Sequence, residues 1–281
     1  MIWNSLLLGL SIGTVMGLTG AGGGILAIPA LVLGIGMSMV AAKPVALLAA
    51  TAGAMLGAAD GLRRGLVRYK AALFMVLLGA ITSPIGQWLA HQVSPELLAV
   101  LFSGILLFVA VRGWRQGTRS RSAILVERVT PCMLNPATGK FSWTPRCFLT
   151  LGGIGAVTGL MTGMLGVGGG FFIVPMLQRF TNLSYQSIVL TSLAVIALVS
   201  GSTVLQMVLH GTRIEPSGWW FVGGTALGMF ASRLFAHKVP QHWLHRGFAL
   251  LVLLAMLLLL LKTFAPHWLP LACTIRRDDL P

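Results

Sequence analysis

The chain contains 281 residues, of which 56% are apolar and only 9% are charged, and its mean hydropathy is +0.87. Soluble domains average about 25% charged residues, and disordered chains combine low hydrophobicity with high charge. The composition therefore excludes both classes and indicates an all-α protein that crosses a membrane several times. The net charge of +14 does not point to nucleic acid, because the basic residues lie between apolar segments, as in the cytoplasmic loops of membrane proteins.

Eight apolar segments are expected along the chain. The first covers residues 2–42 without a charge, about twice the ~20 residues that one membrane-crossing helix needs. We therefore expect it to be broken, re-entrant or doubled back, and the same holds for residues 147–178. The six shorter segments are residues 44–59, 71–90, 97–111, 183–209, 217–232 and 247–261.

The polar stretch 112–146 divides the chain into two parts. It carries seven Lys or Arg residues and one Glu, and we interpret it as a cytoplasmic linker, with a regulatory lid as the alternative. The expected organisation is a first transmembrane repeat at 1–111, this linker, a second repeat at 147–264 and a polar tail at 265–281. The three cysteines, Cys132, Cys147 and Cys273, are odd in number and lack metal-ligand spacing, so neither a disulfide nor a metal or cofactor site is expected.

The chain matches itself when it is shifted by 146 residues. The shift places Gly20 on Gly166, the triplet Gly22-Gly23-Gly24 on Gly168-Gly169-Gly170, and Pro29 on Pro175. Secondary transporters are commonly built from such repeats, with the substrate at the repeat interface. The Lys and Arg pattern does not distinguish parallel from inverted halves. We favour inverted halves, because a charge-free segment of 41 residues fits a hairpin better than one crossing.

The glycine triplets predict two unwound stretches inside the membrane. Each glycine costs a helix about 1 kcal/mol relative to alanine, and a helix restarting after the triplet presents unpaired N–H groups and the positive end of its dipole. Two such starts would form a site for an oxyanion; close helix packing is the alternative explanation. For Gly9, Gly13, Gly155 and Gly159, which recur at four-residue spacing, we expect packing.

Several polar residues in apolar surroundings are candidate site residues. Hydroxyl and amide groups that could donate to the anion are those of Thr19, Thr51, Thr191, Ser192 and Gln206. Lys43 is either an anchor that reaches the membrane surface or a cation that attracts the anion. Asp60 either pairs with Arg64, four residues further on, or couples transport to protons.

These motifs resemble the TauE/SafE family of membrane transporters, the sulfite exporters. The closest likeness is in the second half, in Gly166-Val167-Gly168-Gly169-Gly170, Pro175 and Thr191-Ser192-Leu193, and the resemblance covers nearly the whole chain. The first half departs from the pattern, with Ala21 in place of the valine and Pro44-Val45-Ala46-Leu47 in place of Leu190-Thr191-Ser192-Leu193. The resemblance implies export of sulfite or a related organosulfur anion.

We therefore expect a secondary transporter in the cell membrane, with a small sulfur-containing anion and the lipid bilayer as its partners. Coupling to protons or sodium ions is compatible with this design, and the oligomeric state is left open. An anion channel is the alternative, because it would share the binding physics. An intramembrane enzyme is less favoured, since no His-Glu-x-x-His motif and no evident Ser–His pair occur.

Overall fold

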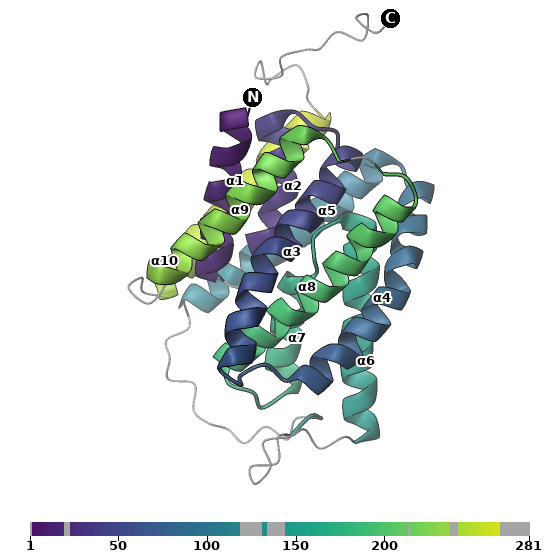
Figure 1. Ribbon diagram of the computed structural model, residues 1–281, viewed down its shortest axis with the longest axis vertical. Coiled ribbons are helices and arrows are strands. Elements are labelled where there is room, and N and C mark those ends of the chain that lie inside the picture. Colours follow the sequence, from purple (N-terminus) through teal and green to yellow (C-terminus); the bar gives the residue numbers. More distant parts are fainter. Residues whose placement is uncertain are drawn as a thin grey trace, which may run out of the picture.

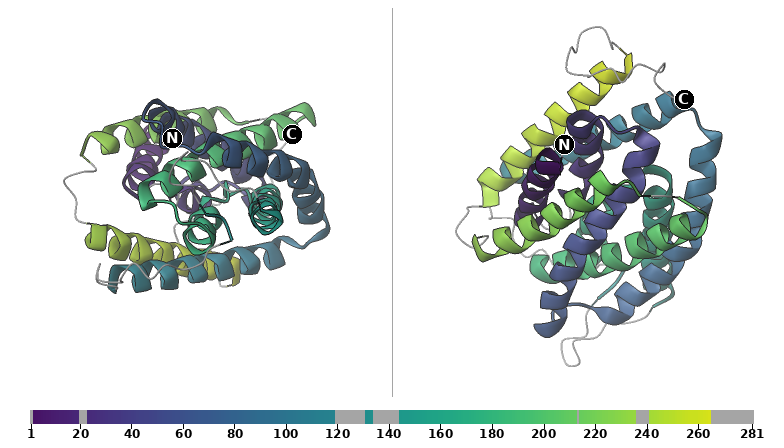
Figure 2. Two further views of the ribbon diagram at one scale, coloured as in Figure 1. Left: turned by 90° about the horizontal axis from the view of Figure 1, so that it is seen from below. Right: turned by 45° about the horizontal axis from the view of Figure 1, so that its top comes forward.

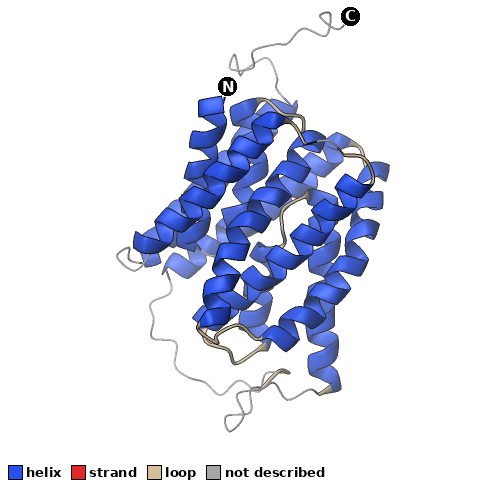
Figure 3. Ribbon diagram, viewed as in Figure 1, coloured by secondary structure: helices blue, strands red, loops and turns tan. Residues whose placement is uncertain are grey.

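The computed structural model describes residues 2–19, 23–118, 131–133, 144–212, 214–235 and 241–264. Within these ranges the chain is helical and forms no strand (Figure 3). An isolated parallel bridge joins Cys132 to Thr181. The all-α expectation is confirmed.

The first half opens with α1 (Ile2–Thr19), followed by three short helical pieces, η1 (Gly23–Leu26), α2 (Ala27–Ala30) and η2 (Leu31–Ile35) (Figure 1). It continues with α3 (Met39–Arg63), α4 (Tyr69–Gln92) and α5 (Pro95–Thr118). The second half consists of α6 (Pro145–Leu165), α7 (Gly170–Phe180), α8 (Tyr185–Leu209), α9 (Pro216–Phe235) and α10 (Gln241–Phe264).

Five of the described helices are long and apolar enough to cross a membrane. They are Met39–Arg63, Tyr69–Gln92, Glu96–Trp114, Pro145–Leu165 and Tyr185–Leu209. Shorter apolar helices cover Trp3–Leu18, Gly24–Ile35 and Gly247–Leu261. By length and composition the chain is a multi-pass membrane protein.

The two halves are built alike, in the register that the sequence repeat predicts. A shift of 146 residues carries the bounds of α3 onto those of α8 and the bounds of α5 onto those of α10. Ser38 and Ser184 cap α3 and α8 in the same way, each accepting a hydrogen bond from a backbone N–H three residues later. Gly65 and Gly211, in the turns after these helices, both have positive φ angles, of 65° and 88°.

The first helix of each half packs against the other half. α1 lies against α9, and α6 lies against α4. A Cβ added at Gly9 or Gly13 would overlap the carbonyl of Phe221 or Thr225 on α9. Gly155 and Gly159 approach Met75 and Gly79 on α4 in the same way. These four glycines therefore allow close helix contact, as expected.

The middle of the molecule is formed by α3 and α8, which cross side by side (Figure 1). Gly61, near the end of α3, contacts Leu190, near the start of α8, whereas Thr51 contacts Gly201 further along α8. The two helices therefore run in opposite directions. α5 and α10 pack together along one flank (Figure 2).

A disulfide joins Cys132 to Cys147, and both cysteines are fully buried. The segment 131–133 returns to contact the end of α7, where Cys132 N donates to Phe180 O at 3.2 Å, and the start of α6, where Thr144 Oγ1 donates to Pro131 O at 3.3 Å. The expectation that no disulfide forms is wrong. The pairing depends on this return of the linker, which an odd cysteine count and a spacing of 15 residues do not reveal.

Candidate anion-binding site

The second long apolar segment is broken inside the helix bundle. α6 ends at Leu165 and α7 begins at Gly170, and the loop between them lies in the middle of the molecule (Figure 3). Gly166, Gly168 and Gly169 have φ angles of 75°, 71° and 64°, a region in which a side chain is strained. The break expected at Gly166–Gly170 is confirmed.

The start of α7 faces this loop with unused donors. The first backbone bonds of α7 run from the N–H groups of Phe172 and Ile173 to Gly169 O, at 3.0 and 3.2 Å. The N–H groups of Gly170 and Phe171 precede them and have no acceptor within the helix. The positive end of the helix dipole lies at the same place.

The first long segment is broken at the matching position. α1 ends at Thr19 and η1 begins at Gly23, while residues 20–22, including the predicted site residue Gly22, lie outside the described residues. A Cβ added at Gly24 would lie 3.7 Å from both Ala50 Cβ and Val167 O. The two breaks are therefore neighbours, as the glycine triplets predict.

Three helices surround the second break with polar groups. A Cβ at Gly168 would lie 3.1 Å from Ser200 Oγ of α8, and one at Gly169 would lie 3.1 Å from Thr162 Oγ1 of α6. Gly166 faces the side chain of Lys43 from α3, with 2.9 Å between its ideal Cβ position and Lys43 Cγ. The loop thus brings an ammonium-bearing side chain and hydroxyl groups to the start of α7.

Ser200 is buried without a partner, and the side chain of Lys43 is largely buried without an ion pair. Ser200 is 0% exposed, and its Oγ makes no hydrogen bond in the described structure. Lys43 is 8% exposed and forms no ion pair with any described residue. Sequence reasoning selected Lys43 but not Ser200 as a site residue, because a single serine inside an apolar helix resembles any back-bonded hydroxyl.

The other predicted donors already have partners. Thr51 Oγ1 donates to Leu47 O at 2.8 Å and Ser192 Oγ to Val189 O at 2.8 Å, whereas Thr191 Oγ1 accepts from Arg68 N at 3.2 Å. Thr191 lies nine residues before Ser200, about 13 Å along α8, so the structure does not bring it to the loop.

The three remaining candidates differ in what the structure shows. Gln206 Oε1 accepts a hydrogen bond from Gln87 Nε2 at 3.2 Å. Asp60 Oδ1 lies 2.9 Å from Arg64 Nε, and the two side chains are 38% and 59% exposed. The side chain of Thr19 lies outside the described residues.

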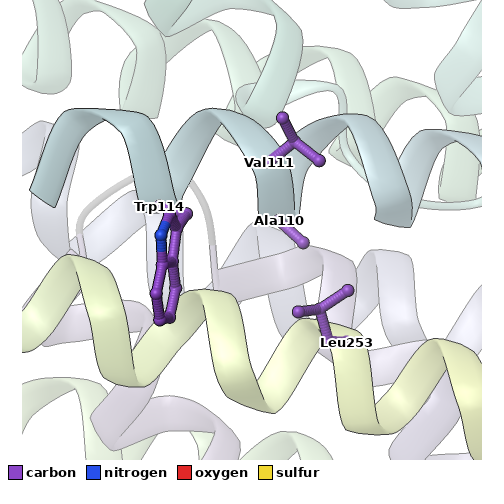
Figure 4. A pocket seen from close by; sticks show the side chains of 4 residues that line it. All are labelled: Ala110, Val111, Trp114 and Leu253. Atoms are coloured by element: carbon purple, nitrogen blue, oxygen red, sulfur yellow. The ribbon is translucent and has the colours of Figure 1, made fainter. Parts of the chain in front are cut away.

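A hollow on the outer flank between α5 and α10 has a different character (Figure 4). It is lined by Ala110, Val111, Trp114 and Leu253. No charged or hydroxyl side chain lines it, and the indole of Trp114 is the one polar group among these four side chains.

Apolar helices in two interlocked halves, with a helix broken in the interior, are features of secondary membrane transporters, and the fold and site indicate this class. The family model described as "Sulfite exporter TauE/SafE" matches residues 5–259, so the chain belongs to this family of membrane transporters.

Two relatives carry the description "Probable membrane transporter protein". One, from Xylella fastidiosa strain Temecula1, is 26% identical over 267 residues, which cover 90% of this chain and 93% of the relative. The other, from Xylella fastidiosa strain 9a5c, is 25% identical over 264 residues with the same coverage. No solved structure matches the chain significantly.

Proposed function

We propose that the protein carries a small sulfur oxyanion such as sulfite across the membrane and binds it at the start of α7. The observation that carries the proposal is a lysine without a counter-ion in the interior: Lys43 is 8% exposed as a residue, has no carboxylate partner among the described residues, and lies against Gly166. A buried charge is costly unless it is paired. A bound anion would supply the missing partner.

The remaining groups at this position suit an oxyanion. The N–H groups at the start of α7 can donate without an intervening Cβ, because Gly168 and Gly169 precede them. Ser200 Oγ, which is buried beside Gly168 without a partner, supplies a further donor. Charge-assisted bonds from such groups hold an anion that has lost its water.

The site combines both halves but uses them unequally. The first half contributes Lys43, and the second half contributes the loop, the start of α7 and Ser200. The sequence predicts a site in which two equivalent helix starts face one anion, whereas the proposed site uses one helix start, that of α7. A site shared between halves would change shape when the halves move relative to each other.

Alternation of access is supported by the packing. Equivalent helices α3 and α8 run in opposite directions, and the exchange of α1 and α6 between halves is reciprocal. Both features favour inverted halves. In such proteins the two halves can swap their conformations, which converts an inward-facing state into an outward-facing one. An anion channel would share the site, but its flux would not saturate in the same way.

The choice of sulfite, the export direction and the coupling ion rest on the family description alone. The cytoplasmic placement of the linker is supported by position. Segment 131–133 and the basic α3–α4 turn lie at the same end of the molecule (Figure 1). A positive-inside arrangement would put both in the cytoplasm, whereas the Cys132–Cys147 disulfide is of a kind that is rare in that reducing compartment.

The test compares Lys43→Met with Lys70→Met, because Lys70 is exposed at the start of α4. Radiolabelled sulfite is used for equilibrium binding to purified protein and for uptake into proteoliposomes. We expect Lys43→Met to weaken sulfite binding by about ten-fold or more, the effect of losing a charged donor, and Lys70→Met to bind normally. Wild-type affinity in a folded Lys43→Met protein would overturn the proposal.

A further inference from the structure

A row of polar side chains continues from the candidate site between α4 and α8. It begins with Ser200 beside Gly168. Three residues further along α8, Thr203 Oγ1 lies 2.7 Å from Ser83 Oγ of α4. After three more residues, Gln206 Oε1 accepts from Gln87 Nε2 of α4 at 3.2 Å. We refer to these five residues as the polar row.

The polar row leads from the interior toward one end of the molecule. Ser200, Thr203 and Ser83 are fully buried, whereas Gln206 and Gln87 are half-buried. Residues three and four apart lie on one helix face, so the row follows a single side of each helix. Its outer members lie one turn before the α8–α9 turn, at the upper end in Figure 1.

The three fully buried polar residues of the row are not repeated in the other half, whereas its two outer glutamines, Gln206 and Gln87, fall on the charged residues Asp60 and Arg233. The shift of 146 residues places Ser200 on Ala54, Thr203 on Gly57 and Ser83 on Met229. Met229 is fully buried, and with Met16 it packs beside Gly53, where an added Cβ would lie 3.8 and 3.1 Å from the two sulfur atoms. Close helix packing is thus achieved there without these hydroxyl groups.

We propose that the polar row is the path by which the anion passes between the site at the start of α7 and the α8–α9 end of the molecule, an inference that rests on the proposed function. Its hydroxyl and amide groups can donate to a partly hydrated anion, and none of the five carries a negative charge that would repel it. Ser200, at the inner end, has an unused hydroxyl directed at the loop.

The hydrogen bonds within the polar row join the two halves, so the path would change when the halves move relative to each other. In each pair, Ser83–Thr203 and Gln87–Gln206, one partner belongs to α4 of the first half and the other to α8 of the second half. The row is closed while these pairs are formed. Thr203 Oγ1 also donates to Val199 O at 2.8 Å and Gln206 Nε2 to Ala80 O at 3.4 Å, so a relative movement of the halves that separates the two pairs would free the donors of Ser83 and Gln87 for the anion.

The first test uses the equivalent substitutions Ser83→Cys and Met229→Cys, each in a chain whose native cysteines are replaced by serine. The probe is a membrane-impermeant methanethiosulfonate, applied to purified protein so that both ends are accessible. We expect the Ser83→Cys thiol to react about ten-fold faster or more, since reaction requires access to the thiolate. Equal rates at the two positions would overturn the path.

The second test separates the path from the site. Thr203→Val keeps the shape of the side chain but removes its hydroxyl. We expect unchanged equilibrium binding of sulfite and uptake reduced by about three- to ten-fold, the effect of one lost hydrogen bond. Unchanged uptake in Thr203→Val, with or without a lower melting temperature, would assign the row to packing alone. Failure of the wild type to bind sulfite would instead overturn the proposed function.

Discussion

Glycine has three different roles at single positions of this chain. Gly155 allows a close contact between helices, because a side chain there would overlap the backbone of Met75. Gly65 provides the positive φ of a turn, with no other atom within 4 Å of its ideal Cβ position. Gly168 combines a positive φ with the approach of Ser200 Oγ and Ala50, so that, of these three glycines, Gly168 is the one at which an added methyl group would enter the candidate site.

Gly168→Ala should weaken sulfite binding by about ten-fold, because the added methyl group would stand between Ser200 Oγ and the loop. Gly65→Ala is the matched control, since a non-glycine residue at either position has the same backbone strain of about 1–2 kcal/mol. Both variants should lose similar stability in detergent, and only Gly168→Ala should lose affinity. Equal affinities would show that the loop does not contact the anion. Gly169 is less suitable, because a side chain there would collide with Thr158.

Asp60→Asn should leave the pH dependence of sulfite uptake unchanged. Asp60 is paired with Arg64 at 2.9 Å, and both side chains are partly exposed, which fits a structural ion pair near the end of α3. Exposed pairs contribute only about 0–1 kcal/mol, so the melting temperature should change little. The measurement is uptake from pH 5 to pH 9, a range of about two units on either side of neutrality, in the variant and in the wild type. A shift of the variant's pH profile relative to that of the wild type would assign proton coupling to Asp60.

At the scale of the elements, close contacts between helices join each half to the other. α1 is packed into the second half through Gly9 and Gly13, and α6 is packed into the first half through Gly155 and Gly159. In a bilayer, helix association depends on close packing rather than on the hydrophobic effect. The glycine columns therefore hold each first helix against its partner.

Gly155→Leu should destabilise the folded protein, because the α6–α4 contact would have to open. Overpacking of this kind costs about 1–3 kcal/mol or more. Gly153→Leu, two residues away on the same helix, is the control: Gly153 is exposed and has nothing within 4 Å, and leucine is the better helix former there. Thermal unfolding in detergent should separate the two variants; similar melting temperatures would contradict the packing role.

At the scale of the whole molecule, the arrangement of the halves determines which turns share a side of the membrane. The turns after α3 and α8 are equivalent in the repeat. They lie at opposite ends of the molecule (Figure 1), as the antiparallel contact of α3 with α8 requires. Parallel halves would place them at the same end.

Arg64→Cys and His210→Cys, at equivalent and exposed positions in these turns, should therefore react with an impermeant thiol reagent from opposite sides of the membrane. The positive-inside rule predicts that the position 64 thiol is the cytoplasmic one. Labelling of intact cells and of inverted vesicles, again without the native cysteines, provides the measurement. Reaction of both thiols from one side would contradict inverted halves.

Much of the fold could be predicted because it follows from residues that are close together in the sequence. The repeat at 146 residues and the breaks at the glycine triplets depend on neighbouring residues or on backbone preference. The candidate site was predicted only in part. The loop and Lys43 were identified, but Ser200 was not, since its lack of a partner depends on what α3 and α6 bring near it.

The sequence by itself therefore determined the membrane class, the two-part repeat, the positions of the breaks and the packing glycines. These features follow from composition, periodicity and the conformational preferences of glycine and proline, which act over a few residues. The tertiary structure alone decided that α1 and α6 exchange between halves, that Thr191 bonds to Arg68 rather than facing the loop, and that Cys132 meets Cys147. Each of these depends on contacts between distant segments, and no local preference encodes which segments become neighbours.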